Sequence, residues 1–559
     1  MTVTYAGIRR YAFSFLALPG IVFALGFLRW YIGVPMALLI LCATVWMLMQ
    51  GKAEPIPSDA PQLRLKRWQC LALLGIVTLW CLLSGLGNLY YQSSDWGARN
   101  AIFRDLIRFD WPVVYASKNA ALVYYIGFWL PPALVGKLFL ALGCGIGTAF
   151  AIGNIALLLW SVAHLYVILL LVMLLTRADT PKRFFAVILI FIGFGGWDII
   201  GAIVKLITVG TPIPRHLEWW THYQFSAMTT CLGWVFNQAI PAWLTVACFL
   251  HEKKLCNYAF LVVMCAASAP LPCVGLAAYM LAVLVWRTVC ACRRRQLPAL
   301  LREILTPQNL IAVFLVFPMW LLYYMSNMAV GAEPTLKQTR IDYPAVAILL
   351  AAAVAMIVLA VWRYRRGGKG LSLLLPGIAL LTVGIWGFFN ADVTWLYLWS
   401  LLLESALYLG VLWWAERDTL LYRVALFSAV LLPLFKIGTD FDFCMRASIP
   451  TVFILAVLSI RFLLCHEDAV TRRRTVAPEQ RLPRVLCLIL IGVLLVGSVT
   501  LMAELVSGVR GVIEAGRLNA VNDGIYTFDQ IFTGERYGAD RNFIAERYLE
   551  TFFFRYLAK

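Results

Sequence analysis

The sequence predicts an all-α membrane protein: a polytopic bundle of about 14–16 transmembrane helices, with a re-entrant or interfacial external segment and a short external C-terminal tail. The 559 residues are 62% hydrophobic and only 14% charged, and the mean hydropathy is +0.81. A water-soluble chain of this length could not bury so much apolar surface. Apolar runs of roughly 20 residues, long enough to cross a bilayer as helices, recur from end to end.

The predicted spans follow these apolar runs. They cover 12–29, 32–50, 68–90, 148–175, 184–208, 237–251, 256–271, 273–291, 310–328, 343–362, 371–388, 394–415, 420–436, 448–465 and 485–505. We divide the chain into an N-terminal hairpin with its loop (1–67), a membrane core (68–255) with an external loop at 91–120, the C-terminal spans (256–505) and the tail (506–559).

The net charge of +18 comes from basic residues whose positions predict the orientation of the protein in the membrane and do not indicate a nucleic-acid partner. Basic residues collect in short connections such as Lys182-Arg183, Arg293-Arg294-Arg295 and Arg472-Arg473-Arg474. Loops of this kind stay on the cytoplasmic side of a membrane. The tail after Val506 mixes acids and bases evenly, as an external segment does. We therefore expect a cytoplasmic N-terminus, an external C-terminus and no cleavable signal peptide.

The apolar stretch from Leu122 to Leu140 does not fit the alternation of spans. Counting back from an external C-terminus leaves room for one crossing between the external loop at Asp95 and the basic loop at Lys182-Arg183, yet two apolar stretches lie there. Pro131-Pro132 falls inside the first stretch and removes helix hydrogen bonds. We predict that this segment is re-entrant or interfacial.

Several classes of chemistry lack their usual motifs. The 14 cysteines form no CxxC pair, and most lie inside apolar runs. The chain contains no GxxxxGK[ST] loop, no Gly-rich dinucleotide fingerprint and no HExxH motif, and the five histidines are scattered. We therefore expect no metal site and no firm cofactor, and a divalent cation lacks the support of a DxD pair.

Candidate catalytic carboxylates and cations gather on the predicted external side. Asp95 and Asp105 lie in the loop at 91–120, and Asp198 lies inside an apolar run. A charge within the hydrocarbon is costly, so Asp198 is a functional candidate, although a pair with Lys205 would also explain it. Arginine provides a bidentate fork for phosphate oxygens. The candidate donor-phosphate ligands are Arg446, Lys436, Arg340 and Arg99.

Two of these cations and four polar residues each have a structural alternative. Lys436 and Arg446 could instead form ion pairs with Asp440 or Asp442. His222 and Gln224 follow an aromatic loop typical of a membrane interface, and Asn237 and Gln238 stand near a predicted helix start. These last four could recognise sugar hydroxyls or only cap and wedge the helices. They are the candidate acceptor and sugar ligands.

The layout resembles the GT-C class of membrane glycosyltransferases, which includes oligosaccharyltransferases, protein mannosyltransferases and aminoarabinose transferases. The resemblance lies in the many spans, in the early external loop with Asp95, Arg99 and Asp105, and in the stretch from Leu122-Val123-Tyr124-Tyr125 to Gly136-Lys137-Leu138-Phe139. That stretch is similar to the aromatic "PPLYYW…KLFG" segment of the class. The chain departs from it because the loop follows the third predicted span, no adjacent acidic pair or DxD stands at Asp95, and the tail is too short for a large acceptor domain.

The resemblance implies transfer of a sugar from a polyprenyl-phosphate donor to an envelope glycan, lipid or protein acceptor at the external face of a bacterial cytoplasmic membrane. Asp95, partly desolvated beside Trp96, would be the general base, and the cations would stabilise the leaving phosphate. Three alternatives remain open: an O-antigen-type polymerase or ligase, a transporter or lipid flippase, and a non-catalytic scaffold.

Overall fold

The computed structural model describes residues 2–53, 62–327, 340–366, 371–436, 442–468, 478–519, 527–532 and 542–559. Within these residues, ten helices are long and apolar enough to cross a membrane, and six shorter apolar helices accompany them. In lipid every backbone N–H and C=O must be satisfied internally, which is why such runs form helices. The protein is a polytopic helical membrane protein, as the sequence predicts.

The N-terminal half supplies the centre of the bundle. Its membrane helices are α1 (Tyr5–Phe27), α2 (Trp30–Ala53), α3 (Arg67–Leu83), α6 (Ile146–Thr176), α7 (Pro181–Gly193), α8 (Asp198–Val209) and α9 (Met228–His251). Helix α9 packs against α1, α6 and α7, and most of its side chains are buried. It is kinked at Val235, whose φ of −138° and ψ of 34° are not helical. The kink lies beside two candidate ligands, Asn237 and Gln238.

The C-terminal half surrounds this centre on one side. Its helices are α10 (Tyr258–Ala266), α11 (Pro270–Arg293), α12 (Leu297–Ile304), α13 (Pro307–Ile311), α14 (Phe317–Met325), α15 (Tyr343–Arg365), α16 (Leu371–Phe389), α17 (Trp395–Leu401), α18 (Leu407–Glu416), α19 (Leu420–Leu431), α20 (Asp442–Ala447), α21 (Ile449–Cys465), α23 (Pro478–Gly497) and α24 (Val499–Ala515). Helix α21 packs against α7 and α9 and so joins the two halves. A π-helical turn, η6 (Leu402–Ala406), connects α17 with α18.

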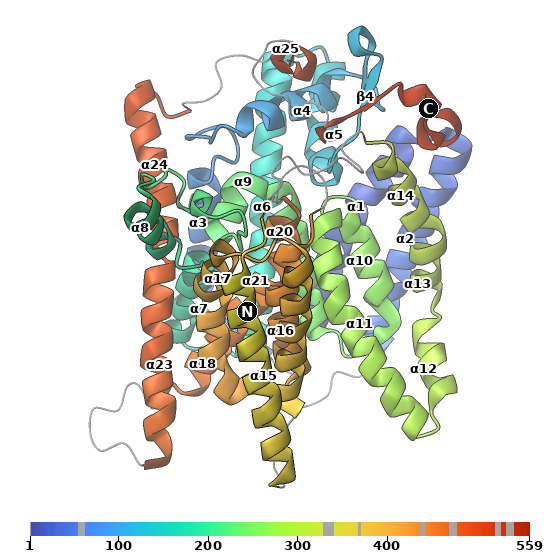
Figure 1. Ribbon diagram of the computed structural model, residues 1–559. Helices are drawn as coiled ribbons and strands as arrows, with labels where there is room; N and C mark the ends of the chain where they lie inside the picture. Colours follow the sequence, from blue (N-terminus) through green and yellow to red (C-terminus); the bar gives the residue numbers. More distant parts are fainter. Residues whose placement is uncertain are drawn as a thin grey trace.

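One end of the bundle carries a cap of short elements, which we call the α4 end (Figure 1, top). It contains α4 (Trp96–Arg108), α5 (Leu130–Ala141), α25 (Phe528–Phe532) and an antiparallel sheet of β3 (Val114–Tyr115), β4 (Ala120–Leu122) and β5 (Ile544–Glu546). Helix α12 and the free ends of α15 and α23 lie at the opposite end. Strand β1 (Thr2–Thr4), at the start of the chain, pairs with β2 (Gln62–Arg64).

We predicted that the stretch from Leu122 to Leu140 is not one spanning helix, and the structure confirms this. The two prolines in this stretch, however, do not break a helix as we expected. Leu122 ends strand β4, and helix α5 begins only at Leu130. Pro131 and Pro132 therefore occupy the first turn of α5, where the missing N–H has no intrahelical partner in any case. They start a short helix instead of breaking a long one.

The C-terminal residues 542–559, which we call the strap, fasten the α4 end to the start of the chain. Strand β5 pairs with β4 in the register Ala120↔Glu546. At its far end, Leu28 forms a β-bridge with Ala558, and Arg29 Nε donates to the Ala558 carbonyl at 3.0 Å. The strap is thus part of the folded cap.

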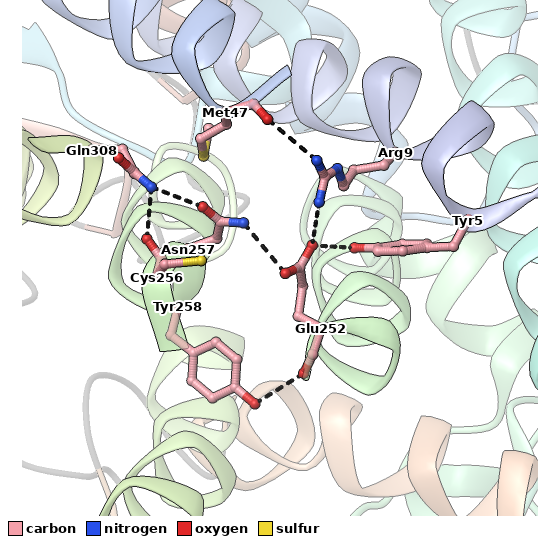
Figure 2. A network of polar contacts seen from close by, with 8 residues as sticks. All are labelled: Tyr5, Arg9, Met47, Glu252, Cys256, Asn257, Tyr258 and Gln308. Atoms are coloured by element: carbon pink, nitrogen blue, oxygen red, sulfur yellow. Dashed lines mark hydrogen bonds and ion pairs between the residues drawn. The ribbon is translucent and has the colours of Figure 1, made fainter. Parts of the chain in front are cut away.

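A polar network near the start of α1 holds α1, α2 and α9 together (Figure 2). Glu252, which caps the C-terminus of α9, accepts from the Tyr5 hydroxyl at 2.7 Å and from Asn257 Nδ2 at 3.3 Å. Arg9 approaches the same carboxylate to 3.6 Å and donates to the Met47 carbonyl at 3.3 Å. Removing one partner of such a buried group leaves the others unsatisfied, so the network fixes the relative placement of these helices.

Candidate functional site

Helix α4 is positioned by its first aromatic side chain. Trp96 is buried, stacks on Phe236 with ring centroids 4.9 Å apart, and donates from Nε1 to the Gly233 carbonyl at 2.8 Å. Both partners flank the kink at Val235 in α9. The kink breaks the helical ladder there and allows the Gly233 carbonyl to accept from a side chain. Asp95, the residue before α4, is thereby held next to α9.

Asp95 and Arg99 form an ion pair across the first turn of α4. Arg99 Nη2 lies 3.0 Å from Asp95 Oδ2, and their side chains are 6% and 53% exposed respectively. The Asp95 carboxylate thus reaches solvent, in contrast to the expected desolvation by Trp96, whose indole packs on α9. The other terminal nitrogen of Arg99, Nη1, is buried without a hydrogen-bond partner. Arg99 thus retains an N–H donor that no group among the described residues accepts.

A second arginine approaches the same place from α20. Arg446 Nη2 lies 3.0 Å from Asp442 Oδ2, and its guanidinium carbon lies 5.7 Å from the centre of the Tyr125 ring. Its Nε is buried and has no hydrogen-bond partner within the part of the chain that the structure describes. Burial lowers the pKa of Arg446, but Asp442 and the phenols of Tyr124 and Tyr125 outweigh this and raise it above its ordinary value. The guanidinium remains charged.

Tyr124 and Tyr125 connect these groups. Burial raises the pKa of the Tyr124 phenol, while Arg446 and Arg99 both act to lower it. The carbonyl of Tyr125 accepts from Asn237 Nδ2 at 3.2 Å. We call Asp95, Arg99, Tyr125, Asp442 and Arg446 the arginine cluster. It unites residues from α4, α20 and the segment before α5, and it offers two cations with unused N–H donors.

Gln238 lies one residue beyond Asn237 on α9. It is fully buried, and neither its amide nitrogen nor its amide oxygen has a hydrogen-bond partner. An unsatisfied buried amide costs about 1–3 kcal/mol, so this side chain is stabilised by any polar group that reaches it. Asn237 and Gln238 are thus both inside the fold rather than capping a helix end, because α9 begins at Met228.

Asp105 lies outside the arginine cluster and fastens α25. It is fully buried, pairs with the buried Arg104, and accepts from the Tyr115 hydroxyl and from the Phe528 amide, each at 2.9 Å. Burial raises the pKa of Asp105 to about 6, although Arg104 and both hydrogen bonds act in the opposite direction. These contacts indicate that Asp105 holds α25 against α4.

Asp198 begins α8, directly after a break in the membrane helix. It is buried and accepts from Trp220 Nε1 at 3.2 Å and from the Thr500 hydroxyl at 2.7 Å. Lys205, the partner considered from the sequence, instead donates to the Trp220 carbonyl at 3.0 Å. Asp198 is therefore held by neutral donors.

The remaining candidates lie apart from the arginine cluster or contact other groups. Lys436 forms an ion pair with Asp392. Of the two partners considered from the sequence, Asp442 pairs with Arg446 and Asp440 lies outside the described residues. Arg340 and His222 are exposed. Gln224 Nε2 donates to the carbonyls of Glu218 at 3.0 Å and Thr221 at 3.3 Å.

Several buried acids were absent from the sequence-based candidates, and one of them, Glu404, lies against the helix break that precedes Asp198. Glu404 lies in the π-helical turn η6 and is buried. The signal that selected Asp198, a carboxylate inside an apolar run, applies equally to Glu404 in the predicted span 394–415. π-Helical turns are frequent at functional sites, but they cannot be read from one sequence.

The described part of the chain contains no group of three or more His, Cys, Asp or Glu side chains placed to hold a metal ion. No protein-family model matches this chain, and neither a curated protein nor a solved structure does so. The function is therefore argued from the residues themselves.

Proposed function

We propose that the protein is a membrane glycosyltransferase that takes a sugar from a polyprenyl-phosphate donor at the arginine cluster. The observation that carries this proposal is the pair of unused donors, Arg99 Nη1 and Arg446 Nε, both buried and both charged. A buried guanidinium with a free N–H favours an anion with several acceptor oxygens. Phosphate is such an anion, and its lipid tail could remain between the helices.

In the proposed reaction, Asp95 accepts the proton of an acceptor hydroxyl. The hydroxyl oxygen attacks the anomeric carbon of the donor sugar and forms the new glycosidic bond. The bond from that carbon to the phosphate oxygen breaks, and the polyprenyl phosphate leaves with the bonding electrons. Arg446 and Arg99 stabilise the charge that develops on it. The solvent-exposed side of Asp95 can pass the proton to water.

Further polar groups support recognition of a sugar beside this cluster. The Tyr125 ring already lies beside Arg446, and Asn237 and Gln238 come from the neighbouring helix α9. Aromatic faces and amides are suited to the apolar and hydroxyl faces of a sugar. Because the energy of transfer would come from the activated lipid, such an enzyme needs no nucleotide-binding domain.

The test is transfer by the purified protein from a synthetic polyprenyl-phosphate sugar, compared among wild type, Arg446→Ala and Arg446→Lys. A hydrogen bond from a charged group contributes about 1.5–3 kcal/mol, so Arg446→Ala should lower the apparent donor affinity by roughly 10–150-fold. Arg446→Lys should restore the activity only partly, because it lacks the planar fork.

The matched control is Arg510→Ala, an exposed arginine that also pairs with an acid four residues away, Glu514. It should leave donor affinity unchanged. Equal activity of wild type and Arg446→Ala, at equal amounts of folded protein, contradicts the proposal. Transfer of a whole glycan in one step would indicate the polymerase or ligase alternative instead.

A transporter or lipid flippase is the second candidate, and one observation favours it. The membrane helix formed by α7 and α8 is interrupted between Phe194 and Trp197, next to the buried Asp198. Discontinuous helices with buried carboxylates are common in secondary transporters. Movement of a lipid-linked sugar across proteoliposomes without a new glycosidic bond would support this candidate.

A further inference from the structure

Three carboxyl groups are buried together where α8, the loop after it and the turn η6 meet. Asp198, Glu218 and Glu404 are 1%, 2% and 6% exposed. They come from segments far apart in the chain, and the backbone N–H of Trp197 joins two of these segments by donating to the Leu403 carbonyl at 3.0 Å. We call these three residues the carboxyl cluster.

Asp198 and Glu404 belong to two segments that lie against each other. Glu404 Oε2 packs against Gly196, two residues before Asp198, and the Trp197 N–H donates to the Leu403 carbonyl, next to Glu404. An ionised carboxylate only accepts hydrogen bonds, so two ionised carboxylates cannot bond to each other. A hydrogen bond between these two carboxyl groups therefore requires a proton on one of them.

Two oxygen atoms of the cluster have no hydrogen-bond partner among the described residues. Glu404 Oε1 and Glu218 Oε2 are buried and accept no hydrogen bond. The other Glu404 oxygen fits against Gly196 in the helix break, where an added Cβ would collide with it. The glycine thus allows this carboxyl group to approach the backbone of the break. An unpartnered buried oxygen is the place where a proton is held at least cost.

The surrounding elements do not supply enough positive charge for three carboxylates. Among the described residues, the titratable groups around the cluster are Lys205 on α8, His216 before η3 (Leu217–Trp220), Cys231 on α9, Tyr408 on α18, Cys444 on α20 and Glu504 on α24. Lys205 is directed to the Trp220 carbonyl, and Tyr408 donates to the Gly195 carbonyl at 2.7 Å. His216 contacts Glu504 at 2.6 Å. The acids remain in excess.

We propose that Asp198 and Glu404 form a proton-binding site that holds one shared proton between their carboxyl groups. Burying an uncompensated charge is far more costly than protonating it. Within the described residues, these acids are not grouped with a third ligand in a way that would hold a metal ion instead. The site is separate from the arginine cluster and does not depend on the proposed transferase activity.

His216 and Glu504 form a partly exposed pair that interacts electrostatically with the carboxyl cluster. His216 is 8% and Glu504 is 18% exposed in the side chain, so the pair is more accessible than the carboxyl cluster. Burial lowers the pKa of His216, but Glu504 and Glu218 outweigh it and raise the pKa overall. Burial and the charge of Asp198 raise the pKa of Glu218 to about 7, while His216 acts in the opposite direction.

The test is infrared spectroscopy of the full-length protein in detergent, which detects the carbonyl stretch of a protonated carboxyl and its shift in D2O. At pH 7.5 the wild type should show this band. Glu404→Gln should lose it, because the amide keeps a donor toward Asp198 but holds no acid proton. Glu514→Gln, which alters an exposed acid, should keep it.

A wild-type spectrum without the carbonyl band of a protonated carboxyl group is by itself enough to overturn the proposal. An unchanged band in Glu404→Gln does the same, and Asp198→Asn provides a second variant if Glu404→Gln does not fold. A band that disappears on adding Na⁺ or K⁺ at constant pH would assign the site to a cation and would also contradict the proposal.

Discussion

The substitution Asp105→Asn distinguishes a structural role of Asp105, in which it holds α25 in place, from a catalytic role. Asp105 and Arg104 are 0% and 1% exposed, and the pKa of Asp105, about 6, leaves the carboxylate ionised at pH 7.5. An Asn oxygen could still accept from the Phe528 amide, but the Arg104 charge would lose its partner. Removing one partner of a buried ion pair costs about 3–5 kcal/mol.

This cost should appear first in the strap and in α25, which Asp105 holds through Phe528. A local loss of 3–5 kcal/mol raises the population of the open form by roughly 10²–10³-fold or more. Limited proteolysis between α24 and β5 should therefore be faster by about that factor in the variant. Asp110→Asn, an exposed aspartate at the same end, is the control and should be cleaved like wild type.

The reasoning predicts that each folded Asp105→Asn molecule keeps its turnover while the yield of folded protein falls. Unchanged proteolysis combined with lost turnover would refute it. In that case Asp105 would act in the chemistry itself, and the anchoring contacts would be secondary.

Three further predictions concern other residues. Asp95→Asn should lower the transfer rate by on the order of 10²–10⁴ with little effect on thermal stability, because the side chain is half exposed; full activity would remove it as the base. Glu218→Gln should flatten the pH dependence of unfolding between about pH 4.5 and 7, since a carboxyl with a raised pKa stabilises the fold at low pH and loses that contribution as pH rises through about 7. A C-terminal alkaline-phosphatase fusion should be active and a green-fluorescent fusion dark if the α4 end is external; the reverse result would invert the predicted orientation.

The sequence predicts the helical membrane architecture well because that architecture depends on local composition. Apolar runs and basic loops are readable without tertiary contacts, and so is the interruption near Pro131-Pro132. The role of those prolines was not readable, because a proline that begins a helix and one that breaks it look alike in a sequence.

The candidate site is less predictable because its partners come from distant segments. Asp95 with Arg99 is a local pair at helical spacing, but the approach of Arg446 depends on how α20 packs beside Tyr125. Lys436, a candidate phosphate ligand, pairs with Asp392, which is 44 residues away in the sequence. Glu404 approaches Asp198 only because η6 lies against the helix break. These contacts cannot be predicted from the spacing of residues in the sequence.

The contact between Asp105 and Phe528 also imposes an order on biosynthesis. The two residues are 423 positions apart, so a ribosome working at about 5–20 residues per second makes the second roughly 20–80 seconds after the first. Strands β3 and β4 wait for β5 over a similar interval. During that time the Arg104–Asp105 ion pair, which is buried in the complete fold, and the edge of strand β4 that pairs with β5 remain uncovered. A chaperone or protease at the membrane could use this surface to distinguish nascent chains from finished ones.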